Sequence, residues 1–166
     1  MKLYVMRHSV AEDVSRDGSD GARALTAIGR DRARDVAKVL LELDEAPRAI
    51  VSSPLVRALQ TAEIVHAHAG LDVPLEIAQE MSPGGDALAM VLTAARMNRK
   101  RLMVVGHEPD VSTLVARLIG APPRAGFGKA MVVGIRVTPE GDHATLRFVL
   151  DPKTCSLSLD RRQDLR

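Results

Sequence analysis

Short apolar runs alternate along this chain with longer segments in which apolar residues recur every three or four positions. The runs lie near residues 2–7, 48–52 and 101–105. The period of the segments between them is that of amphipathic helices. The apolar stripe of the first such segment consists of Ala33, Val36, Ala37, Leu40 and Leu43. Because strands that alternate with helices form mostly parallel sheets covered on both faces, we predict a single three-layer α/β domain.

The C-terminal part of the chain departs from this alternation. Two apolar runs, near 130–137 and 144–150, flank the turn sequence Pro139-Glu140-Gly141-Asp142, which predicts an antiparallel hairpin at one side of the sheet. Residues 156–166 are polar, so we expect a domain over 1–155 followed by a tail. No repeat or linker divides the 166 residues, a length that suits one domain.

Composition argues against several classes of protein. Aromatic residues make up only 2% of the chain, too few for the stacking platforms that bind single-stranded nucleic acid. The net charge is +2, and Lys and Arg are spread along the sequence, so we do not expect a nucleic-acid partner. Cys155 is the single cysteine, which fits a reducing compartment. The N-terminal apolar run is too short for a signal peptide, and no run reaches membrane-spanning length, so we expect a cytoplasmic protein without membrane contact.

Arginine and histidine follow all three predicted strands. Arg7-His8 ends the first run, Arg57 follows the second and His107 follows the third, directly after Gly106. The carboxyl ends of strands form the active-site edge of open α/β sheets. Arginine side chains match the oxygens of a phosphate, and a neutral histidine is a nucleophile. The pattern favours an anion-binding catalytic site over separate surface or helix-capping roles.

The segment after the second strand predicts a helix start. Ser53 has the side chain of an N-cap, and Pro54 suits the first helical position. Arg57 then falls in the first turn, where the positive end of the helix dipole disfavours a cation. A bound anion would explain an arginine at this position.

The motifs Arg7-His8, Ser53-Pro54-x-x-Arg57-Ala58-x-x-Thr61 and Gly106-His107, in this order, resemble the histidine phosphatase superfamily. Two further motifs resemble its compact bacterial branch, the SixA-type phosphohistidine phosphatases: Arg23-x-Leu25-Thr26-x-x-Gly29 and Glu80-x-x-Pro83-x-Gly85-Asp86. The resemblance runs from residue 2 to about residue 120 and implies the phosphoglycerate mutase-like fold.

By this resemblance His8 is the nucleophile that takes up the phosphoryl group. Arg7, Arg57 and His107 would bind that group and stabilise its charge, and Arg23 would add an anion contact. Neither a metal nor a cofactor is implied.

One position departs from the family pattern, and at another the family pattern leaves the residue's role undecided. Ser9 stands where the family usually has glycine, and its hydroxyl is a possible substrate-binding donor. Glu80 lies near the position of the general acid of mutase-like members. A phosphorylated imidazole leaves more easily than an alkoxide, so a phosphohistidine phosphatase has less need of that acid.

The favoured hypothesis is a phosphatase for phosphohistidine on proteins, such as a histidine phosphotransfer domain. The chain has no room for the large insertions that build a small-molecule lid in mutases. One alternative is a phosphatase of small phosphomonoesters that uses the same residues. Another is a binding module for phosphorylated ligands, without catalysis.

Overall fold

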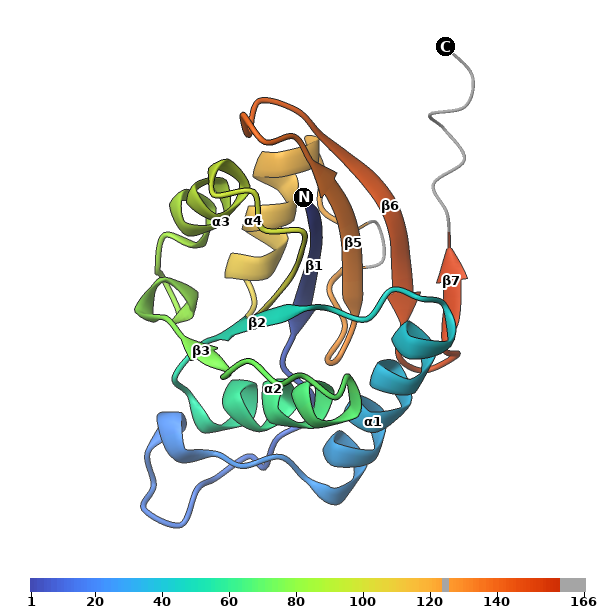
Figure 1. The fold of residues 1–166 in the computed structure, drawn as a ribbon. Coiled ribbons are helices and arrows are strands. Elements are labelled where there is room, and N and C mark those ends of the chain that lie inside the picture. The colour runs from blue at the N-terminus through green and yellow to red at the C-terminus, as the bar shows by residue number, and fades with distance from the viewer. Residues whose placement is uncertain (124–125, 159–166) are drawn as a thin grey trace.

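The computed structural model describes residues 1–123 and 126–158, which form one mixed sheet between two layers of helices (Figure 1). The strand order is β3-β2-β4-β1-β5-β6-β7. The strands described are β1 (Lys2–Arg7), β2 (Ala49–Ser52), β3 (Glu76–Ile77), β4 (Arg101–Gly106), β5 (Val132–Val137), β6 (Ala144–Asp151) and β7 (Ser156–Ser158). The helices described are α1 (Ala27–Glu42), α2 (Val56–His68), α3 (Ala87–Arg96) and α4 (Asp110–Ile119), with the short 3-10 turns η1 (Asp20–Ala22) and η2 (Gln79–Met81).

The predicted three-layer fold is confirmed. β1, β2, β3 and β4 are parallel, whereas β5, β6 and β7 add antiparallel pairs at one side, including the predicted hairpin. Side chains alternate along each strand, so one face packs against α1 and α2 and the other against α3 and α4. The core between these layers is aliphatic, as the composition indicates.

Two sequence predictions need correction. Ser53 is not the N-cap of α2, because that helix begins at Val56 and Leu55 is its N-cap. The hydroxyl of Ser53 accepts from the Leu55 N–H at 3.3 Å and lies 2.8 Å from Nε2 of His107. The predicted tail also begins later than residue 156, because Ser156–Ser158 form β7 beside β6. Residues 159–166 of that tail lie outside the described part of the chain.

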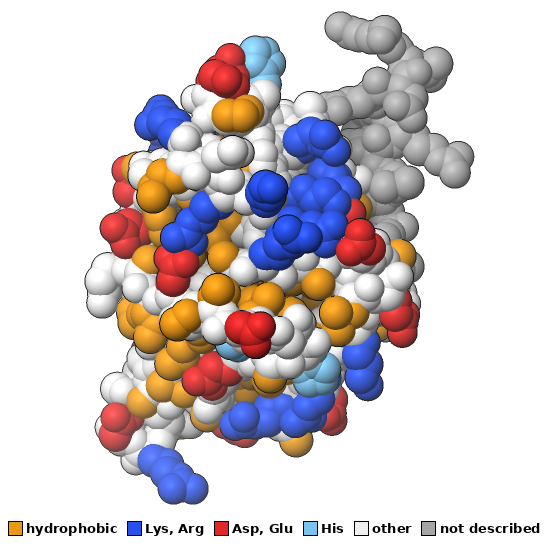
Figure 2. All heavy atoms as spheres, viewed as in Figure 1, with side chains coloured by type: hydrophobic (Ala, Val, Ile, Leu, Met, Phe, Trp, Pro, Cys, Tyr) orange, Lys and Arg blue, Asp and Glu red, His pale blue; other side chains and the backbone are white. Residues whose placement is uncertain are grey.

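Basic side chains that are distant in sequence meet at the amino-terminal end of β1. In the sheet register Lys2 lies opposite Arg101 of β4 and Arg136 of β5. The carboxylate of Glu45, just after α1, accepts hydrogen bonds from Lys2 at 3.1 Å and from Arg147 at 2.8 Å. Figure 2 shows a gathering of blue side chains in this region. The basic residues are therefore not evenly spread in space, although they are spread along the sequence.

Within the described ranges, no helix is long and apolar enough to cross a bilayer.

Candidate active site

His8 follows β1 directly and is held there by backbone and ring hydrogen bonds. Its backbone N–H donates to the Gly106 carbonyl oxygen at 3.0 Å, which ties the end of β1 to the end of β4. Its ring Nδ1 lies 2.7 Å from the carbonyl oxygen of Ser9. A carbonyl oxygen only accepts, so Nδ1 carries the proton. Nε2 therefore keeps its lone pair, as a nucleophile requires.

The loop after His8 is fixed by a chain of hydrogen bonds to two helices. The N–H of Ser9 donates to Thr61 Oγ1 at 3.0 Å, and the Thr61 hydroxyl donates to the carbonyl oxygen of Arg57 at 2.7 Å. The Ser9 hydroxyl donates to the Gly29 carbonyl oxygen at 2.7 Å. Gly29 packs so closely that a Cβ there would lie 2.0 Å from the Val10 carbonyl oxygen. The loop is thus clamped between α1 and α2.

Ser9 therefore has a structural partner for the hydroxyl that the sequence suggests as a substrate donor. The side chain is fully buried. A substrate contact through this hydroxyl would have to break its hydrogen bond to Gly29.

Arg57 projects from the first turn of α2 and is almost fully buried, at 5% exposed. Its Nη1 donates to the Asp20 carbonyl oxygen at 2.7 Å, and its Nη2 lies 2.9 Å from Asp20 Oδ2. The other carboxylate oxygen of Asp20 lies 2.9 Å from Nη2 of Arg23. In this structure the anion beside the first turn of α2 is therefore the Asp20 side chain.

Several buried N–H groups of the arginines have no hydrogen-bond partner in the described part of the chain. These are the Nε atoms of Arg7, Arg23 and Arg57. Nη1 of Arg7 donates a hydrogen bond to the Phe127 carbonyl oxygen at 2.7 Å. A buried donor without an acceptor costs about 1–3 kcal/mol, so such groups call for a ligand. A tetrahedral oxyanion, which accepts several hydrogen bonds, would satisfy them.

His107 follows β4 and faces the first histidine. The centroids of the His8 and His107 rings lie 5.1 Å apart. Nε2 of His107 lies 2.8 Å from Oγ of Ser53, whereas its buried Nδ1 has no partner among the described residues. Each histidine is thus oriented through one ring nitrogen, and the other ring nitrogen has no hydrogen-bond partner among the described residues.

Both histidines are held neutral. Burial is the main cause that lowers the pKa of His8 to about 3. The hydrogen bond to the Ser9 carbonyl acts in the opposite direction, whereas the nearby His107, Arg57 and Arg7 lower the pKa further. Burial likewise lowers the pKa of His107 to about 4, with Arg57 as the next cause. At neutral pH the site therefore contains two neutral imidazoles beside the positive charges of Arg7 and Arg57.

Glu80 lies in η2 and is exposed. It lines a small cavity together with His107 and Asp110. Its carboxylate has no hydrogen-bond or ion-pair partner within residues 1–123 and 126–158. A Cβ at Gly85 would lie 2.4 Å from the Glu80 carbonyl oxygen, so the tight turn that places Glu80 beside this cavity needs glycine.

The structure brings together most of the residues singled out in the sequence. His8 and His107 face each other, and charges of Arg7 and Arg57 act on both. Arg23 joins them indirectly, through its shared carboxylate partner Asp20. Sequence analysis missed the part played by Asp20, because nothing along the chain links it to an arginine 37 positions later.

The fold and the site together define a class of protein. Paired neutral histidines and arginine N–H groups at the carboxyl ends of parallel strands are suited to phosphoryl transfer, which depends mainly on positioning and electrostatic stabilisation.

Comparison with known proteins gives the family. Residues 3–83 match the histidine phosphatase superfamily (branch 1). An uncharacterized protein of Picosynechococcus sp. is 38% identical over 141 residues, which cover 82% of this chain and 85% of that protein. The phosphohistidine phosphatase SixA of Escherichia coli is 29% identical over 163 residues, which cover 96% and 98%. This chain belongs to the histidine phosphatase superfamily.

Solved structures agree with this assignment. The protein histidine phosphatase SixA complexed with tungstate has a TM-score of 0.84 at 28% identity, covering 94% of this chain and all of that one. A mycobacterial glucosyl-3-phosphoglycerate phosphatase in complex with VO3 shares the fold, with a TM-score of 0.68 at 17% identity over 87% of this chain and 96% of that one.

Proposed function

We propose that this protein hydrolyses phosphohistidine on proteins through a phospho-His8 intermediate, without a metal ion. The observation that carries the proposal is the hydrogen bond from His8 Nδ1 to the Ser9 carbonyl, because it leaves Nε2 free to attack. The arginine N–H groups supply the positive charge that the transferred phosphoryl group needs.

Two displacements complete the reaction. In the first, His8 Nε2 attacks phosphorus, the N–P bond of the substrate breaks, and the released imidazole takes up a proton from solvent. In the second, water attacks the phosphorus of phospho-His8, the N–P bond to His8 breaks, inorganic phosphate leaves, and the proton lost by the attacking water returns to solvent. The neutral state of His8 favours the first step, and the orienting bond to Ser9 lets the ring return to the same tautomer after the second.

Two observations support a protein as the substrate: the similarity to Escherichia coli SixA and the shortness of the segment between β2 and β4. Escherichia coli SixA, which matches nearly the whole chain, is a phosphohistidine phosphatase. Between β2 and β4 the described chain holds only α2, β3, η2 and α3, so the segment contains no large insertion that would enclose a small substrate. A phosphorylated side chain on another protein, such as a histidine phosphotransfer domain, suits such a site.

Hydrolysis of small phosphomonoesters is the second hypothesis. The observation that favours it is the exposed Glu80, a residue without a side-chain partner among the described residues that borders the same small cavity as His107. An alkoxide leaving group needs a proton, which Glu80 would donate as a general acid.

Phosphoenzyme trapping tests the chemistry. The protein is mixed with labelled phosphoramidate or a labelled phosphohistidine domain, quenched within milliseconds, and the label is mapped. We expect an acid-labile, alkali-stable phosphate on His8 that is absent from His8→Ala. Phosphate binding without label or turnover would contradict the mechanism and favour a non-catalytic binding module.

Substrate comparison separates the two enzyme hypotheses. We expect kcat/KM for a phosphohistidine protein to exceed the values for sugar and nucleotide phosphates. Glu80→Gln should leave turnover of phosphoramidate, a small donor with an N–P bond, within a few-fold, whereas hydrolysis of an alkyl phosphate by the same variant should drop sharply. Higher kcat/KM for an alkyl phosphate in the wild type would support the second hypothesis.

A further inference from the structure

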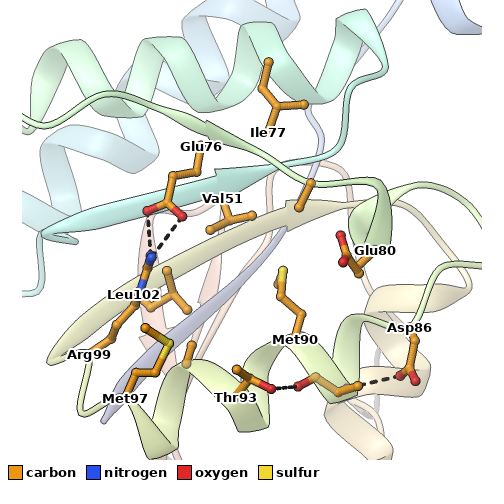
Figure 3. Close-up of a pocket in the computed structure, with 13 residues that line it drawn as sticks. Val51, Glu76, Ile77, Glu80, Asp86, Met90, Thr93, Met97, Arg99 and Leu102 are labelled. Carbon is orange, nitrogen blue, oxygen red and sulfur yellow. Dashed lines mark hydrogen bonds and ion pairs between the residues drawn. The ribbon is translucent and has the colours of Figure 1, made fainter.

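A groove of about 540 Å³ lies at the β3 edge of the sheet, between β2 and α3 (Figure 3). Its volume is within the usual range of ligand sites, about 300–1,000 Å³. Buried side chains of β2 and β4, Val51 and Leu102, form its floor. Met90 of α3 and Met97, the C-cap of that helix, form one wall. None of these side chains takes part in the site described above.

One stretch of the rim of the groove is apolar. The side chain of Met97 is 71% exposed at its rim, and small residues, Ala89 and Ala94, leave its wall open. Methionine side chains adapt to the shape of an apolar partner, which is why they are frequent on binding surfaces. A large apolar side chain of a ligand would occupy part of this space and remove Met97 from water.

The two ends of the groove differ in charge. At one end Arg99 forms a two-pronged ion pair with Glu76, with N–O distances of 2.6 and 2.9 Å, so this end is neutral. At the other end lie Glu80 and Asp86 (Figure 3). Asp86 caps the N-terminus of α3 by accepting from the N–H of Ala89, and neither carboxylate has a cationic partner among the described residues. This end therefore attracts a positive charge.

The acidic end of the groove is also the end next to the active site. Glu80 lines the groove and, at the same time, the small cavity lined by His107. A ligand that spans both sites would place an anion among the arginines, a cation beside Glu80 and Asp86, and an apolar group beyond them. A ligand that carries only a phosphate and hydroxyl groups would leave the acidic and the apolar parts of the groove without a matching group.

We propose that the groove docks a segment of the phosphorylated protein substrate, one with a lysine or arginine and a large apolar side chain on the same side of the phosphohistidine. The proposal rests on the proposed function, and it adds a site for substrate selection outside the catalytic residues. The basic side chain pairs with Glu80 and Asp86, and the apolar side chain enters between Met90 and Met97.

A peptide library provides the test. Peptides with a central phosphohistidine and randomised flanks are incubated with the wild-type protein, and the sequences that lose phosphate first are identified. Phosphoramidate serves as the donor without flanks. In the wild type we expect about tenfold preference for peptides with Lys or Arg and a large apolar residue at fixed positions on one side.

Three substitutions divide this preference into its parts. Met90→Gln with Met97→Gln keeps side-chain length and should remove the preference for the apolar residue. Asp86→Asn keeps a good helix cap and should weaken the preference for the basic residue. The matched control is Leu41→Gln on α1, a leucine that is 42% exposed on the opposite face of the sheet, and it should keep both. Each preference is expressed relative to phosphoramidate turnover by the same variant, and thermal unfolding checks that each variant is folded.

The outcomes separate this proposal from the proposed function. Turnover of the library without sequence preference, or a preference that survives the groove substitutions, would overturn the docking site and leave the phosphatase assignment intact. If the groove substitutions lowered turnover of small aryl phosphates but left the sequence preference among peptides unchanged, the groove would be assigned to small molecules instead. No turnover of any phosphohistidine donor, and no label on His8, would overturn the proposed function and the docking site with it.

Discussion

The carboxylate of Asp20 forms an ion pair with Arg57 from a loop that lies far from α2 in sequence, with Oδ2 and Nη2 separated by 2.9 Å. The arginine is buried, whereas 66% of the Asp20 side chain is exposed, so a competing anion has access to this contact from solvent. The pair lowers the pKa of Asp20, with the hydrogen bond from Arg57 as the main cause. Asp20 thus stays charged, and it competes with a phosphate for the arginine.

Asp20→Asn should therefore strengthen phosphate binding. The asparagine keeps the hydrogen-bonding shape but loses the charge that repels an incoming anion. Because an exposed ion pair contributes little, about 0.2–1 kcal/mol, we expect a decrease of about threefold in the inhibition constant of inorganic phosphate. Asp13→Asn, in the same loop and also exposed, is the matched control. Weaker phosphate binding in Asp20→Asn would show instead that Asp20 holds Arg57 in its binding orientation.

The low pKa of His8 predicts how the site responds to acid. An unfolded histidine titrates near 6.5, and the folded pKa is about 3, so below pH 6.5 the unfolded chain binds the proton more readily. Keeping His8 neutral therefore destabilises the fold increasingly as pH falls from 6.5 towards 3. In an NMR titration, the ring signals of His8 are assigned by their absence in His8→Ala. We expect their chemical shifts at pH 5 to be those of a neutral imidazole.

Phosphate should reverse part of this effect. An anion bound to Arg7 and Arg57 offsets the charges that lower the pKa of His8, so the same NMR titration in saturating phosphate should show a higher pKa. An unchanged pKa under these conditions would mean that phosphate binds away from His8.

Thr61 is the residue through which α2 holds the loop after His8. Thr61→Val keeps the side-chain shape but removes the acceptor of the Ser9 N–H and the donor to the Arg57 carbonyl. The unpaired, buried Ser9 N–H should cost about 1–3 kcal/mol of unfolding free energy, and looser positioning should lower kcat for phosphoramidate by about tenfold.

Thr93→Val is the control for this substitution. Thr93 makes the same kind of hydrogen bond to the carbonyl one turn earlier, that of Ala89, but on the exposed surface of α3. Equal losses of kcat in the two variants would contradict a positioning role for Thr61.

The sequence predicts the site well where topology alone brings residues together. His8 and His107 follow β1 and β4, which are parallel neighbours, so their meeting follows from the strand order. Arg57 enters the same edge because α2 starts just after β2, which pairs with β4.

Contacts made by loops are harder to predict from the sequence. Asp20 reaches Arg57 through the path of the loop before α1, which no periodicity describes. Ser53 has the side chain of a helix cap, yet α2 begins three residues later, and the hydroxyl serves both the Leu55 N–H at 3.3 Å and the ring of His107 at 2.8 Å. The contact with His107 crosses from one strand end to another, so no local sequence pattern predicts it. The strand β7 is polar and three residues long, so nothing in its sequence sets it apart from a tail.

Glu45 predicts an acid-sensitive contribution to stability at the end of the sheet opposite the active site. The hydrogen bond from Arg147 is the main cause that lowers its pKa to about 2, with further hydrogen bonds from Tyr4 and Lys2. Since the unfolded value is near 4.5, Glu45 stabilises the fold fully above pH 4.5 and loses this contribution as pH falls towards 2. Glu45→Gln should lower the unfolding free energy at pH 7 by about 2 kcal/mol, and the difference from the wild type should shrink towards pH 2.

Glu42→Gln is the control for the loss of a negative charge. Glu42 is exposed at the end of α1, so its substitution should change the unfolding free energy by less than about 0.5 kcal/mol. A difference between Glu45→Gln and the wild type that stayed constant from pH 7 to pH 2 would assign the effect to packing rather than to the ionised carboxylate.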